Sequence, residues 1–166
     1  GADEMLALNP RLIYCSISAF GQSGSRSEEA GYDAMIQASA GLMSITGSSG
    51  EPQKVGVAIS DIMAGMYAST AILAALNARA TSGVGQYIDV PLYDSQVAWL
   101  ANQNMNFLVG GKVPQPMGNA HPNLVPYQTF ATSDGCLMLA VGNDRQFVNC
   151  CNAIGLDELA SDARFT

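Results

Sequence analysis

The sequence predicts an α/β fold in which helices cover a parallel sheet, followed by the start of a smaller α+β unit. Two short segments, 11–18 and 87–94, are β-branched and apolar, as buried strands are. A long helical segment, 61–80, lies between them, and strands joined through a helix run parallel. Four of the seven prolines then fall within 111–126, where the composition changes.

The first half of the chain alternates strand and helix signals. Residues 2–8 are typical of the end of a helix, which Asn9-Pro10 stops. The strand 11–18 leads into a Gly- and Ser-rich loop over 18–31. Apolar residues at three- and four-residue spacing then predict one helix over 32–47. A turn-rich loop (47–54), a short extended segment (55–59) and the longest helix (61–80) are expected to follow.

The second half continues the pattern with a second strand. The segment 87–94 predicts a strand with Pro91 near its end, followed by a second long helix over 95–111. A β-hairpin is expected over 127–142, with its turn at Ser133-Asp134-Gly135. An amphipathic helix over 143–154 has Asn143 or Asp144 as its expected cap.

Composition excludes several classes of function. The 166-residue chain is 48% hydrophobic and 13% charged, as a globular domain is. A net charge of −7 with seven scattered basic residues argues against nucleic acid as a partner. No signal peptide and no uninterrupted apolar run of about 18 residues or more is present, so we expect no membrane span.

The four cysteines show no spacing typical of a metal site. They stand at 15, 136, 150 and 151, without a CxxC pair or a matching histidine pattern. We therefore expect no metal, reduced thiols, a cytoplasmic protein, and Cys150 and Cys151 as helix-packing residues.

Several phrases, taken together and in this order, resemble the family III CoA-transferases, also called the CaiB/BaiF family. They cover nearly the whole chain: NPRLIYCSISAFGQSG (9–24), AGYDAMIQASAGLMSITG (30–47), VGVAISDIMAGMYASTAILAAL (55–76), TSGVGQYIDVPLYDSQVAWL (81–100) and GNAHPNLVPYQTFATSDGCLMLAVGNDRQF (118–147). Family members are about two to three times as long, so this sequence is expected to match their central part. The resemblance implies that residues 1–110 form part of a Rossmann-like large domain carrying the catalytic aspartate, that 111–126 is a linker or site loop, and that 127–166 begins a small α+β domain.

Asp61 is the candidate nucleophile. It stands before a long uncharged run and matches the reactive aspartate of the family, in a pattern with glycines at 56 and 65. A carboxylate can attack an acyl-CoA thioester without a base to activate it, which suits a chain that lacks a Ser/His or Cys/His set. The alternative is that Asp61 only caps its helix, a common use of aspartate.

Tyr32 distinguishes the transferases from the related racemases. The racemase branch has histidine at this place, because proton abstraction beside a thioester needs a base that titrates near neutral pH. Tyr32, with Glu29, Ala30 and Gly31, matches a CoA-contacting stretch of the family. The formyl-CoA transferases have lysine where Ala30 stands, so a cation for a CoA phosphate is lost here or supplied elsewhere. A packing aromatic is the alternative for Tyr32, and Asp33 is interpreted as structural, capping the same helix.

The segment 118–128 replaces a glycine-rich loop of the formyl-CoA transferases. Its polar residues Asn119, His121 and Gln128 are candidates to contact the acceptor acid or the pantetheine arm. His121 is the single histidine and, being followed by Pro122, is typical of an ordinary loop residue. The different loop favours a dicarboxylic or other organic acid as readily as formate.

The resemblance thus implies an enzyme that moves CoA between carboxylic acids through a covalent aspartyl intermediate. Coenzyme A and acyl-CoA enter as substrates, no tightly bound cofactor is expected, and the family forms an interlocked homodimer. Two alternatives stay open: an acyl-CoA racemase or isomerase of the same family, and a non-catalytic fragment that only folds or associates.

Overall fold

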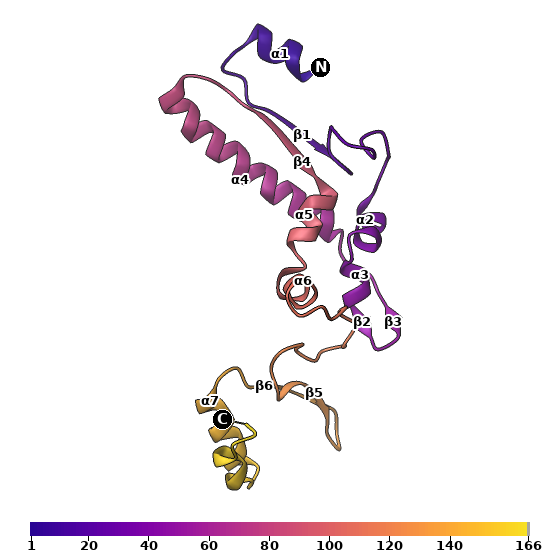
Figure 1. Cartoon of the computed structure of the whole chain (residues 1–166), viewed down its shortest axis with the longest axis vertical. Coiled ribbons are helices and arrows are strands. Elements are labelled where there is room, and N and C mark those ends of the chain that lie inside the picture. The colour runs from indigo at the N-terminus through magenta and orange to yellow at the C-terminus, as the bar shows by residue number, and fades with distance from the viewer. Residues whose placement is uncertain (166) are drawn as a thin grey trace. The chain divides into compact units, whose positions relative to one another are not determined.

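The computed structural model describes residues 1–165 and forms two compact units (Figure 1). The first unit is Gly1–Pro116 and the second begins at Met117, so the division falls inside the segment 111–126. The first unit opens with α1 (Ala2–Leu8), which ends at Asn9 ahead of Pro10.

The predicted parallel sheet is confirmed as a two-stranded sheet in the first unit. β1 (Tyr14–Ser18) pairs in parallel with β4 (Tyr87–Pro91), and the register runs from Tyr14 opposite Tyr87 to Ser18 opposite Pro91. Both strands are shorter than expected, since the N-terminal strand begins at Tyr14 and α5 already begins at Leu92. Helices in the connection between the strands allow the parallel arrangement.

The single helix expected over 32–47 is wrong, because the chain breaks it at Gly41. α2 (Asp33–Ser39) ends and α3 (Leu42–Ile45) begins around this glycine, whose φ is +96°. That left-handed conformation favours glycine and cannot continue a right-handed helix. The next segment forms a two-residue-strand hairpin, β2 (Gly47–Ser48) with β3 (Glu51–Pro52), where only a loop was expected.

The longest helix is α4 (Ile59–Ser82), which begins two residues before the predicted start. It ends at Gly83, whose N–H donates to the Arg79 carbonyl in a left-handed cap. Most of its buried residues are small, among them Ala64 and Ala68, which share one core with Ile36, Val90 and Leu92. Small side chains allow this helix to lie close against the sheet, as Figure 1 shows for α4 beside β1 and β4. The segment 55–58 before it forms no strand.

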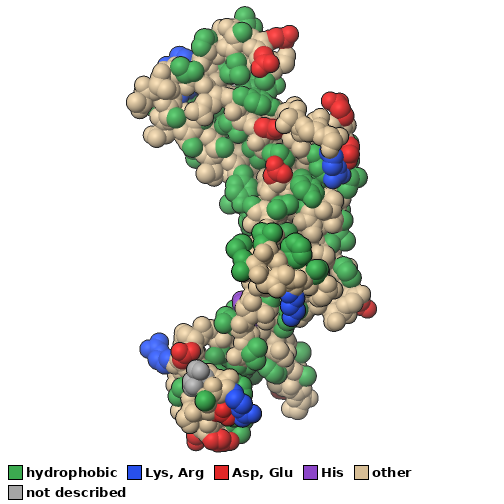
Figure 2. Space-filling model, in the orientation of Figure 1, with side chains coloured by type: hydrophobic (Ala, Val, Ile, Leu, Met, Phe, Trp, Pro, Cys, Tyr) green, Lys and Arg blue, Asp and Glu red, His purple; other side chains and the backbone are tan. Residues whose placement is uncertain are grey.

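α4 is also apolar on the side that faces away from this core. Five large hydrophobic residues of the helix are exposed: Ile62, Met66, Tyr67, Leu73 and Leu76. By length and composition alone the helix could span a membrane, with a mean hydropathy of 1.5, a test that core helices also pass. Hydrophobic side chains are spread widely over the face seen in Figure 2.

The second long helix expected over 95–111 is also divided. α5 (Leu92–Ala98) and α6 (Ala101–Leu108) are separated at Trp99 and Leu100, and Ala101 has a φ of +46°. Neither glycine nor proline marks this break, so no local sequence signal predicts it.

The second unit contains the predicted hairpin and helix. β5 (Tyr127–Ala131) pairs antiparallel with β6 (Cys136–Ala140), and α7 (Asp144–Ala153) follows. Asn143 is the cap of α7, since its side chain accepts the Gln146 N–H at 3.0 Å. A short 3-10 helix, η1 (Asp157–Ser161), was not expected. All four cysteines are free thiols, with Cys150 half-buried and Cys151 buried in α7.

Candidate active site

Asp61 is the third residue of α4 and is exposed to solvent. The N-cap of this helix is Ala58, so the alternative that Asp61 only caps the helix is wrong. Within residues 1–165 its carboxylate has no hydrogen bond or ion pair. It lies in the first helical turn, where free backbone N–H groups stabilise negative charge by about 0.3–1 kcal/mol.

The cap of α4 is supplied instead by Asp33, from another helix. The backbone N–H of Ser60 donates to Asp33 Oδ1 at 2.8 Å. Asp33 is the first residue of α2 and makes no cap bond to its own helix, contrary to the expectation for it. A carboxylate that accepts an orphan N–H does for α4 what a local capping residue would do.

Gln37 extends this connection to the segment before α4. Its side chain is fully buried, and its Nε2 donates to Asp33 Oδ2 at 2.8 Å and more weakly to the Val57 carbonyl at 3.4 Å. Its Oε1 accepts the Val55 N–H at 2.8 Å. One side chain thus holds both the capping carboxylate and the backbone that leads into the Asp61 helix.

Ser60, the residue before Asp61, is held a second time through its hydroxyl. Ser60 Oγ donates to Gln96 Oε1 at 2.6 Å, and the two residues are 0% and 1% exposed. Gln96 belongs to α5, so the first turn of α4 is bound to both neighbouring helices. We call Asp33, Gln37, Ser60 and Gln96 the polar clamp. Sequence reasoning missed all of it except Asp33, although polar residues within apolar helical segments were a signal for it.

Tyr32 lies at the N-cap of α2, with its side chain 81% exposed. It therefore has little packing within this chain, which does not support the alternative of a packing aromatic. Its neighbour Asp33 is bonded to Ser60, the neighbour of Asp61. This hydrogen bond brings the segment that contains Tyr32 next to the segment that contains Asp61. The two bonded residues are 27 positions apart in the sequence.

The other predicted CoA contacts lie in the loop before Tyr32. The Glu29 carboxylate is engaged by Arg26, at 2.9 Å from Nε and 2.8 Å from Nη2, and the Arg26 guanidinium stands 3.6 Å from the centroid of the Phe20 ring. Ala30 is exposed. Gly31 is closely packed, since a Cβ there would be 2.8 Å from the Cβ of Ala19. Arg26 is the one cation between positions 12 and 53 of the sequence.

The predicted acceptor contacts all lie in the second unit. Asn119 Nδ2 donates to Thr129 Oγ1 at 3.0 Å, and Gln128 is exposed on β5. His121 is half-buried, accepts the Asn123 N–H at Nδ1 at 3.0 Å, and lies against Tyr127 with the rings tilted by 51° and their centroids 5.1 Å apart. These bonds give His121 a clear role in holding the loop.

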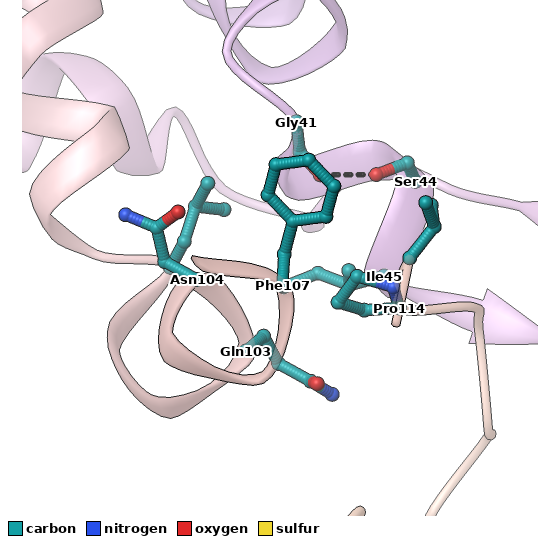
Figure 3. A pocket seen from close by; sticks show the side chains of 9 residues that line it. Gly41, Ser44, Ile45, Gln103, Asn104, Phe107 and Pro114 are labelled. Atoms are coloured by element: carbon teal, nitrogen blue, oxygen red, sulfur yellow. Dashed lines mark hydrogen bonds between the residues drawn. The ribbon is translucent and has the colours of Figure 1, made fainter. Parts of the chain in front are cut away.

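An apolar pocket of about 290 Å³ lies between α3 and α6 (Figure 3). Its lining includes Gly41, Ser44 and Ile45 together with Phe107, Val113 and Pro114, and the Ser44 hydroxyl donates to the Gly41 carbonyl at 2.7 Å. The residues that line it include no titratable side chain, so the pocket holds no general acid or base that could activate the Ser44 hydroxyl. Within residues 1–165, no cluster of three or more His, Cys, Asp or Glu could hold a metal ion.

Comparison with known proteins identifies the family. The sequence matches the CoA-transferase family III over residues 1–166. The chain belongs to this family. The solved structure of a CaiB/BaiF family protein from Brucella suis is 52% identical and superposes with a TM-score of 0.78, covering 98% of this chain and 43% of that one. Rv3272 from Mycobacterium tuberculosis, in orthorhombic crystals, is 30% identical with a TM-score of 0.80, covering 99% of this chain and 43% of that one.

Named relatives within family III are CoA-transferases. A succinate–glutarate CoA-transferase of Agrobacterium fabrum is 52% identical over 98% of this chain and 41% of its own length. A succinyl-CoA:glutarate CoA-transferase of Mus musculus is 43% identical (99% and 38%), and an acetyl-CoA:oxalate CoA-transferase of Acetobacter aceti is 39% identical (98% and 42%). The chain therefore spans about two fifths of the length of these curated relatives. The racemase alternative is not favoured.

Proposed function

We propose that this chain carries the nucleophile of a CoA-transferase, and that the nucleophile is Asp61. The observation that supports this most directly is an exposed carboxylate, unpaired among residues 1–165, in the first turn of α4, in a place held by buried hydrogen bonds to two other helices. An aspartate with a purely structural role in such a turn would use its carboxylate oxygens to accept free backbone N–H groups of the helix. Here Asp33 already fills that role by accepting the Ser60 N–H.

The proposed reaction runs through the Asp61 carboxylate in two half-reactions. A carboxylate oxygen attacks the thioester carbonyl of the donor acyl-CoA, and the C–S bond breaks to give a mixed anhydride and CoA thiolate. The thiolate attacks the aspartyl carbonyl carbon and releases the donor acid, leaving an aspartyl–CoA thioester. The acceptor carboxylate then attacks this thioester, and the released thiolate attacks the acceptor carbonyl. Acceptor-CoA leaves and the Asp61 carboxylate is regenerated, without net proton transfer.

Short dicarboxylates are the proposed acids. Two of the relatives named above act on succinate or succinyl-CoA and glutarate, at 52% and 43% identity. Glu29, Ala30, Gly31 and Tyr32 are proposed to contact CoA, and Asn119, His121 and Gln128 to contact the acceptor acid. Arg26 is the cation nearest in sequence to Ala30, where the formyl-CoA transferases have lysine. It is proposed to bind the CoA phosphate when its ion pair with Glu29 opens. We further propose an interlocked homodimer acting in the cytoplasm.

Trapping of the covalent intermediate tests this function. The full-length protein is incubated with succinyl-CoA or glutaryl-CoA, hydroxylamine is added, and peptides are analysed by mass spectrometry. We expect a hydroxamate at Asp61 and none in Asp61→Asn, which keeps the shape of the side chain but removes the nucleophilic oxygen. Asp94→Asn, an exposed aspartate in the first turn of α5, is the matched control and should trap normally. A protein that exchanges acyl groups without any adduct at Asp61 would disprove the assignment.

A further inference from the structure

The first turn of α4 is held more firmly than a helix start requires. Its Ser60 N–H and Ser60 hydroxyl have separate partners on α2 and α5, at 2.8 Å and 2.6 Å. Capping alone would need only the first of these bonds. The second joins two side chains that are essentially fully buried, where a polar group without a partner would be costly.

Two fixed points on Ser60 determine where Asp61 points. A helix turns by about 100° per residue, so the rotation of the first turn about its axis sets the direction of the next side chain. The Asp33 bond fixes the backbone of Ser60, and the Gln96 bond fixes its rotation toward α5. Gln37 fixes the approach of the chain by binding the backbone of Val55 and Val57.

We propose that Gln37 and the Ser60–Gln96 pair are positioning residues for Asp61. They touch neither substrate nor reacting atoms, and act by holding the carboxylate at the distance and angle at which it attacks the thioester. This inference rests on the proposed nucleophilic role of Asp61. An attack of this kind loses up to about a hundredfold in rate when the reacting group moves by about 1 Å.

The contribution of the Ser60–Gln96 pair to stability can be measured separately from its contribution to the position of Asp61. Ser60→Ala alone leaves Gln96 Oε1 without its donor, so both the melting temperature and the trapping rate should fall. The double variant Ser60→Ala/Gln96→Met makes both positions apolar, and such a replacement is close to neutral for stability. We expect the double variant to recover the melting temperature while hydroxamate formation at Asp61 stays at least about tenfold slower than in the unchanged protein.

The matched control removes an exposed hydroxyl farther along the same helix. Thr70 is exposed and its hydroxyl donates to the Met66 carbonyl at 2.9 Å, so Thr70→Val should leave the trapping rate unchanged. We also expect the slower rate in the double variant to lie in kcat, with the KM for acyl-CoA within about twofold, because no substrate contact is removed.

The outcomes separate this inference from the function on which it rests. No adduct at Asp61 in the unchanged protein would overturn both. An adduct in the unchanged protein, formed at the same rate in the double variant, would leave the function standing and show that the pair serves folding alone. A KM that rises while kcat stays constant would also overturn the positioning role, since it would place the pair in substrate binding.

Discussion

The Asp33 carboxylate accepts the backbone N–H of Ser60 at 2.8 Å and thereby caps a helix 27 residues further along the chain. The same carboxylate accepts Gln37 Nε2 at 2.8 Å through its other oxygen. Asp33 follows the exposed Tyr32, and Ser60 precedes the exposed Asp61. One hydrogen bond therefore joins the two segments that the proposed reaction needs in one place.

Removing this carboxylate should destabilise the fold. Asp33→Ala leaves the Ser60 N–H and the Gln37 amide short of an acceptor, and we expect the free energy of unfolding to fall by about 1–3 kcal/mol. Urea denaturation followed by circular dichroism measures this. Asp3→Ala, on the exposed α1, is the control and should change the value by less than about 0.5 kcal/mol. Equal stability of the two variants would show that the cap contributes nothing.

Gly31 should tolerate no side chain. A Cβ there would lie 2.8 Å from Ala19 Cβ and 3.2 Å from Ile36 Cδ1, and Ile36 is fully buried. We expect Gly31→Ala to lower the free energy of unfolding by about 1–3 kcal/mol through overpacking. The double variant Gly31→Ala/Ala19→Gly removes the closest contact and should recover part of the loss, as a double-mutant cycle would measure. A cycle with zero coupling would contradict this packing.

Gly65 presents the opposite case, because nothing lies within 4 Å of a Cβ built on it. Gly65→Ala in the middle of α4 should raise the free energy of unfolding by about 0.5–1 kcal/mol. The methyl group that this substitution adds lies one helical turn from Asp61, on the same face, since residues four apart share a face of a helix. We therefore expect the KM for acyl-CoA to rise although the protein is more stable. A lower melting temperature, or kinetics that do not change, would count against this arrangement.

The thiols should react in an order set by exposure and ionisation. Cys136 is exposed, whereas burial, followed by the negative charge of Asp89, raises the pKa of the half-buried Cys15 thiol. The thiolate is the reactive form, so iodoacetamide at pH about 8 should modify Cys136 well before Cys15. Raising the pH increases the thiolate fraction of Cys15 and should narrow the difference. Peptide mass spectrometry follows each site, Cys136→Ser removes the fast phase, and equal rates at pH about 8 would contradict the prediction.

Sequence patterns predicted the sheet and the helix that carries Asp61 because both depend on local periodicity. The β-branched segments around Tyr14 and Tyr87 pair in the predicted parallel sense, and α4 differs from its expected start by two residues. The wrong predictions concern where helices end, which depends here on packing between segments far apart in the sequence. Gly41 divides one expected helix, and the break at Trp99 and Leu100 has no Gly or Pro to announce it.

The candidate site shows the same division. Asp61 and Tyr32 were found from family phrases, with a helix cap kept as the alternative for Asp61 because an aspartate near a helix start often caps that helix. The true cap, Asp33, comes from a helix packed across the start of α4, which no local pattern reveals. Gln37 and Gln96 were missed for the same reason, since their partners are 18 and 36 residues away in sequence.

The interruption between α5 and α6 has a spectroscopic consequence. The single tryptophan, Trp99, stands at that interruption with 42% of its surface exposed, three residues after Gln96 of the polar clamp. Tryptophan fluorescence therefore reports on one defined place, a partly exposed indole at the end of α5, the helix whose Gln96 binds Ser60. The emission of the unlabelled protein can thus be used to follow whether α5 stays packed against the start of α4 when acyl-CoA is added. No label needs to be attached near Asp61.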